Sequence, residues 1–88
     1  LPKKIYGKEK REGLTIIAFD VPEQKRRRRD WLREHLTALG FSQLQKSVWA
    51  GKNRGVPQEF VKDLRAHRML PYIHIFSVTK QGTIKEVR

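Results

Sequence analysis

Residues 14–40 read LTIIAFDVPEQKRRRRDWLREHLTALG, and the rest of the chain can be placed from them. The apolar beginning, residues 14–21, predicts a buried strand. Pro22 cannot donate a ladder hydrogen bond, and it presets the backbone for the start of a helix. A helix over residues 23–39 should follow and end at Gly40, because glycine accepts a positive φ without steric strain. These residues therefore predict a strand followed directly by a helix.

The predicted helix has an apolar side and a basic beginning. Leu32, Leu36 and Leu39 recur at helical spacing, which predicts that they pack on the core. The same side, carried back to the helix start, reaches Lys25, Arg28 and Arg29 of the basic run at residues 25–29. That run lies near the end of the first strand, where Asp20 emerges. A carboxylate is therefore expected to face a cluster of cationic side chains.

The remaining sequence predicts further strands and a second helix. Residues 41–45 and 47–52 predict two short strands joined by a tight reversal, and residues 57–69 predict a helix. Residues 72–79 alternate as a strand does, and residues 83–87 could add an extra C-terminal strand. The order βαββαβ predicts an α+β, ferredoxin-like fold, with a four-stranded antiparallel sheet and both helices on one face.

The chain has 88 residues, which is enough for one hydrophobic core. We expect residues 1–13 to form a basic linker or arm and residues 14–88 to form the folded domain. The sequence has no cysteine, and its three histidines lack the spacing of metal ligands. No apolar run reaches the roughly 20 residues that a membrane-spanning helix needs. No signal peptide is visible, so we expect a cytoplasmic protein.

The formal charge of the chain is +11. A balance this basic favours nucleic acid as the partner, because neutralising phosphates releases counterions. Cations at a helix N-terminus oppose the helix dipole, so a binding role explains the run better than helix stability does. An ordinary solvated helix start is the alternative. The candidate nucleic-acid-binding residues are Lys25, Arg26, Arg27, Arg28, Arg29, Lys52 and Arg54.

Two helices cover only one face of the predicted sheet. The other face would present apolar side chains to water, which favours a partner. We expect Trp49, Phe76 and Val78 to lie on that face, covered by a homodimer packed sheet to sheet. Trp49 could instead stack on a base, as aromatic side chains do in RNA-binding modules.

Several of these motifs occur together in known families. The strand end at Phe19 and Asp20, the arginine-rich helix start and the string Gln-Lys-Ser-Val-Trp at residues 45–49 resemble the CRISPR-associated Cas2 endonucleases. The chain is more similar to the Cas2-like middle domain of PaaX-type transcriptional regulators, whose strand end has the pattern seen at residues 19–23. Both resemblances imply a ferredoxin-like fold and sheet-to-sheet dimers. Residues 1–13 resemble the linker that follows a winged-helix domain in such regulators.

The two resemblances imply different roles for Asp20. Resemblance to the nucleases implies that Asp20 from two chains holds one Mg²⁺ or Mn²⁺, which activates water for phosphodiester hydrolysis. From the residues alone, Asp20 could instead cap the helix or pair with Arg28 or Arg29. Our main interpretation is a homodimerising, nucleic-acid-associated regulator domain that needs no cofactor. A metal-dependent endonuclease, or a subunit of the adaptation integrase, is the alternative.

Overall fold

The structure is a computed structural model that describes residues 9–79, 82 and 84–87. Within these residues it contains two α-helices and one five-stranded antiparallel sheet. None of the described helices has the length and apolar character needed to span a membrane. The strands are β1 (Glu9–Phe19), β2 (Ser42–Gln45), β3 (Val48–Gly55), β4 (Ile73–Val78) and β5 (Ile84–Glu86). The helices are α1 (Arg26–Ala38) and α2 (Gln58–Ala66), with short 3-10 turns η1 (Glu23–Lys25) and η2 (Leu70–Tyr72).

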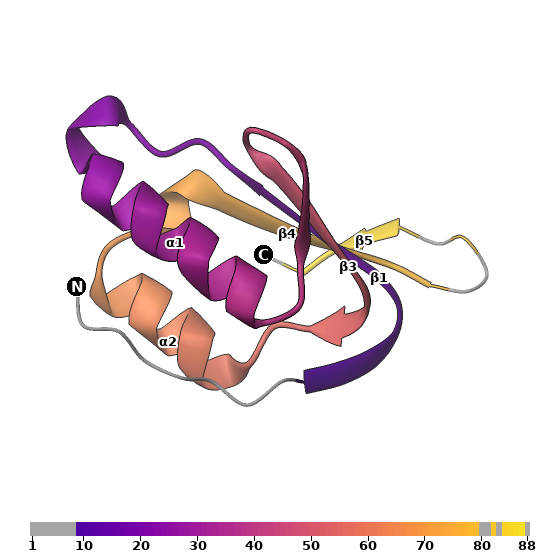
Figure 1. Cartoon of the computed structure of the whole chain (residues 1–88). Coiled ribbons are helices and arrows are strands. Elements are labelled where there is room, and N and C mark those ends of the chain that lie inside the picture. The colour runs from indigo at the N-terminus through magenta and orange to yellow at the C-terminus, as the bar shows by residue number, and fades with distance from the viewer. Residues whose placement is uncertain (1–8, 80–81, 83, 88) are drawn as a thin grey trace.

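Both helices lie side by side on one face of the sheet (Figure 1). The strand order is β2-β3-β1-β4-β5, with β1 antiparallel to both of its neighbours. This arrangement confirms the α+β, broadly ferredoxin-like prediction. The predicted count of four strands is wrong, because β5 pairs with β4 and extends the sheet beyond it. Residues 84–86, foreseen as an optional strand, are therefore part of the sheet.

Alternation along the strands decides which side chains face the helices. On β1, Ile17 and Phe19 are buried, whereas the half-buried Ile16 and Ala18 point to the opposite face. The helices supply the rest of the core from their apolar sides. Its members include Leu32 and Leu36 from α1, Phe60 and Leu64 from α2, and Met69, Ile73 and Ile75 from the chain that follows.

The central strand begins earlier than predicted. β1 starts at Glu9 rather than at Leu14, and Glu9 pairs with Gly55 on β3. The ladder shifts register between Lys10 and Leu14, and Gly13 has a φ of 94° there. The backbone pairing continues across this bulge. Residues 9–12 are all charged, so no apolar alternation marks them as part of the strand. Of the predicted arm, residues 1–8 lie outside the described residues.

The first predicted helix begins with a tighter turn. The backbone N–H of Lys25 donates to the carbonyl of Pro22 at 2.8 Å, which closes a 3-10 turn before α1 begins at Arg26. At the other end, the N–H of Phe41 donates to Leu36 across Gly40, whose φ is 92°. Gly40 is thus the left-handed residue that ends the helix, as predicted.

Candidate nucleic-acid interface and open sheet face

Three arginines at the start of α1 differ from the rest of the basic run in their contacts. Arg26 and Arg27 are exposed, and Arg28 is half-buried. None of the three has an ion-pair partner among the described residues. The first turn of α1 contains no acidic residue, so the three cations there oppose the helix dipole. These cations reduce the stability of the helix, and a bound polyanion would offset that cost.

The other two cations of the run make contacts within the domain. The Lys25 ammonium lies 5.9 Å from the centroid of the Tyr72 ring. Arg29 pairs with Glu23, with 3.2 Å between Nη1 and Oε2. Residues 24–28 together line an open hollow of about 510 Å³. The five cations of the run at residues 25–29 therefore divide into three arginines without an ion pair in the described part of the chain and two side chains that make contacts there.

The structure separates Lys52 and Arg54 from this surface. Lys52 pairs with Leu14 across the β1–β3 ladder, on the sheet face away from the helices. A Cβ built on Gly40 would lie 2.9 Å from Nε of Arg54, so the Arg54 side chain packs against the C-terminal end of α1. A cation is favourable at that end of a helix. Because α1 has 13 residues, its two ends are about 20 Å apart.

The sheet face away from the helices, called the open face below, is apolar at its centre. Ile16 on β1 lies there between Ala50 on β3 and Phe76 on β4. No described element covers this face (Figure 1). An uncovered apolar surface of this kind favours a partner. Its apolar side chains are Leu14, Ile16, Ala18, Val48, Ala50, Phe76, Val78 and Ile84.

Trp49 does not lie on the open face, and the prediction that it would is wrong. Its side chain is 5% exposed and belongs to the core under the helices. In the β2–β3 hairpin, Trp49 pairs with Gln43 and Val48 pairs with Gln45, which turns Val48 outward instead. Alternate residues of this segment place apolar side chains on both faces of the strand. The sequence alone therefore could not decide which of Val48 and Trp49 faces the core, and strand pairing decided it. Burial of the ring also rules out base stacking.

Phe76 and Val78 do lie on the open face, as predicted. The edge beyond them carries charge, because His74 and Glu86 form a pair across β4 and β5. Their Nδ1 and Oε1 atoms are 2.9 Å apart, and both side chains are more than half exposed. The open face therefore combines an apolar centre with a polar rim, which is the usual anatomy of a protein–protein interface.

Asp20 follows β1 and remains exposed. Its backbone N–H donates to the carbonyl of Tyr72 at 2.9 Å, whereas its carboxylate has no partner among the described residues. The starts of η1 and α1 use no side-chain hydrogen bond. Arg29 pairs with Glu23 instead of Asp20. Neither structural role predicted for Asp20, as a helix cap or as a partner of Arg28 or Arg29, is therefore present.

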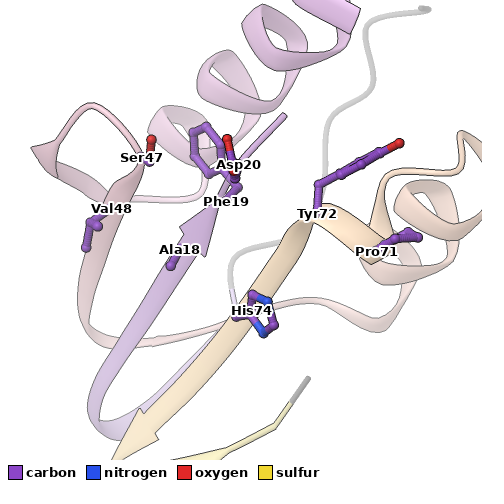
Figure 2. A pocket seen from close by; sticks show the side chains of 8 residues that line it. All are labelled: Ala18, Phe19, Asp20, Ser47, Val48, Pro71, Tyr72 and His74. Atoms are coloured by element: carbon purple, nitrogen blue, oxygen red, sulfur yellow. The ribbon is translucent and has the colours of Figure 1, made fainter. Parts of the chain in front are cut away.

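The carboxylate lines an open pocket of about 360 Å³ at the end of the sheet (Figure 2). Polar groups reach this pocket from the β2–β3 turn at Ser47 and from β4 at His74. In Figure 2 the Tyr72 ring points away from Asp20. The remaining lining residues are Ala18, Phe19, Val48 and Pro71.

The pocket does not by itself fit a divalent cation. No group of three or more His, Cys, Asp or Glu side chains that could hold a metal occurs in the described part of the chain. Mg²⁺ prefers octahedral oxygen coordination, and one chain offers it a single free carboxylate here. The described residues of one chain therefore do not supply the ligand set of a Mg²⁺ site.

The fold and these surfaces define a small ferredoxin-like domain with one covered sheet face, one open face and a cationic helix start. A comparison with known protein families matches residues 12–88 to the PaaX protein central Cas2-like domain. The match spans most of the sequence, and the chain belongs to this family. This confirms the resemblance that the motifs indicated. Comparisons with curated proteins and with solved structures gave no match.

Proposed function

We propose that this domain forms a homodimer through its open face and contacts nucleic-acid phosphates through Arg26, Arg27 and Arg28. Its setting is a transcriptional regulator of the PaaX type, which membership of the PaaX central-domain family supports. One observation carries the proposal. A small domain combines an uncovered apolar sheet face with three arginines that lack any partner among the described residues.

A second copy of the chain is the occupant that suits the open face. An apolar patch that is continuous across β1, β3 and β4 is complementary to itself, so a two-fold axis can bury both copies at once. Two sheets packed face to face would interdigitate side chains such as Ile16 and Phe76. The polar pair of His74 and Glu86 lies at the edge of the face, where water can still reach it.

The arginines suit phosphates better than bases. A guanidinium group donates two parallel hydrogen bonds to phosphate oxygens, and such contacts position a protein without reading sequence. The cations are consecutive on one helix, so they fan around its start and cannot all reach one base edge. The domain would therefore add affinity and register, while sequence selection would rest with another part of the regulator.

Nucleic-acid binding can be tested with two variants of equal charge. The first changes Arg26, Arg27 and Arg28 to Gln, and the control changes the exposed Lys46, Lys62 and Lys85 to Gln. We expect the arginine variant to bind a random 30-base-pair DNA duplex at least about tenfold more weakly, with a salt slope lower by about 2 to 3. The control should change much less. Equal losses would mean that net charge alone drives binding and would overturn the proposed surface.

A further inference from the structure

The turn that ends α2 has an arginine, Arg68, in a backbone conformation that favours glycine. The N–H of Met69 donates to Leu64 at 2.9 Å, and the N–H of Arg68 donates to Arg65 at 3.0 Å. This pair of bonds is the Schellman motif, whose penultimate residue adopts a left-handed conformation. Arg68 has a φ of 58° at that position, whereas α1 ends with the same pair of bonds around Gly40. Glycine is favoured there, so helix termination does not explain the choice of arginine.

Contacts between rings place the end of α2 against α1. The Trp31 and His67 rings are 5.9 Å apart. Arg27 and Arg28 precede Trp31 by one helical turn and share its side of α1. Figure 1 shows that α2 ends at the same end of the molecule at which α1 begins. Since Arg68 directly follows His67, its backbone belongs to the end of the molecule that carries the three arginines at the start of α1.

The chain after Arg68 is joined to the same basic end. Tyr72, in the turn that leads into β4, has the Lys25 ammonium over its ring. Arg68 is exposed and has no side-chain partner among the described residues. Cations from the start of α1 and from the end of α2 thus lie at one end of the molecule. None of Arg26, Arg27, Arg28 and Arg68 has an ion-pair partner among the described residues. Their mutual repulsion falls when an anion binds between them.

We propose that Arg68 extends the phosphate-contacting surface of α1 onto α2, so that a nucleic-acid backbone lies across both helix ends. This inference rests on the proposed function, since it adds a residue to the same surface. Contacts from two separate elements would define the direction in which the nucleic-acid backbone runs. Contacts from the start of one helix would only attract it. On this proposal, the charge of Arg68 serves binding, although an arginine at this positive φ ends the helix less favourably than a glycine would.

Arg68→Gly tests the inference because it should move stability and affinity in opposite directions. Removing the left-handed side chain should raise the Tm by a few degrees. Affinity for a random 30-base-pair DNA duplex should fall at least about threefold, with a salt slope lower by about 1. Arg68→Asn, which also suits this backbone, should weaken binding similarly. Lys85→Gln, which removes one charge on β5, should leave both affinity and slope nearly unchanged.

The outcomes separate this inference from the proposed function. An unchanged affinity and salt slope in both Arg68 variants, with binding still lost in the variant of Arg26, Arg27 and Arg28, would overturn the role of Arg68 alone. Full binding by the variant of Arg26, Arg27 and Arg28 would overturn the proposed surface itself. A loss in Lys85→Gln as large as that in Arg68→Gly would also overturn the inference, because net charge would then explain both.

Discussion

Arg68 and Gly40 occupy equivalent positions at the ends of the two helices, with φ angles of 58° and 92°. The two residues meet different surroundings. Both residues are exposed, but the side chain of Arg54 lies beside Gly40, whereas the side chain of Arg68 has no partner among the described residues. The same backbone motif therefore serves packing at one helix end and presents a cation at the other.

Gly40→Ala should destabilise the domain by about 1 to 2 kcal/mol or more, measured by urea denaturation. A side chain at this φ is strained, and its Cβ would lie 2.9 Å from Nε of Arg54. Gly82→Ala is the matched control, because Gly82 has a φ of 84° and no heavy atom within 4 Å of a built Cβ. We expect the control to cost less. A Gly40 variant as stable as the parent would contradict the packing of Arg54 on this helix end.

Ile16→Lys should prevent the proposed homodimer from forming without unfolding the chain. Ile16 points to the centre of the open face, so a lysine there would bury an unpaired charge only when two copies meet. Light scattering at micromolar concentration should show half the mass of the parent. Far-ultraviolet circular dichroism should show an unchanged fold.

The neighbouring residue gives the control for this experiment. Ile17 is 2% exposed in the core. Ile17→Lys should therefore unfold the chain, since a buried unpaired charge costs several kcal/mol against a total stability of about 5 to 15 kcal/mol. A parent protein that is monomeric at tens of micromolar, or an Ile16 variant that stays dimeric, would argue against dimerisation through the open face.

Lys52→Gln and Arg54→Gln should leave DNA affinity within about twofold of the parent value at low salt. Both residues lie away from the start of α1, although the sequence grouped them with the basic run. Arg54→Gln should instead lower the Tm, because its side chain packs against the end of α1. Fluorescence anisotropy and thermal denaturation measure the two effects. A large loss of affinity in either variant would mean that the nucleic acid follows a longer path over the surface.

Asp20→Asn separates a binding domain from a nuclease. The carboxylate is exposed and has no partner among the described residues, so the substitution should change stability by no more than about 0.5 kcal/mol. We expect neither the parent nor the variant to cleave DNA or RNA with Mg²⁺ or Mn²⁺ present. Cleavage by the parent that falls about a hundredfold in the variant would favour the nuclease interpretation instead.

Local patterns in the sequence were sufficient for the order of elements and for the family. Apolar runs, helical spacing and the breaks at Pro22 and Gly40 act over a few residues, so they predict strands and helices without knowledge of their partners. The same patterns failed where the local signal was weak. The first part of β1 is charged and has no apolar alternation, and the short, exposed segment at residues 84–86 became a strand only by pairing with β4.

The assignment of side chains to surfaces depended on the tertiary structure, because strand register and helix contacts join residues far apart in sequence. Pairing across the β2–β3 hairpin decided that Trp49 is buried and Val48 faces outward. The packing of Trp31 on His67 brought Arg68 to the basic end of α1, a residue that no sequence pattern had singled out. Charge and composition predicted an anionic partner, but they act over the whole chain. Only the folded arrangement of the two helices decided which cations lie together at one end of the molecule.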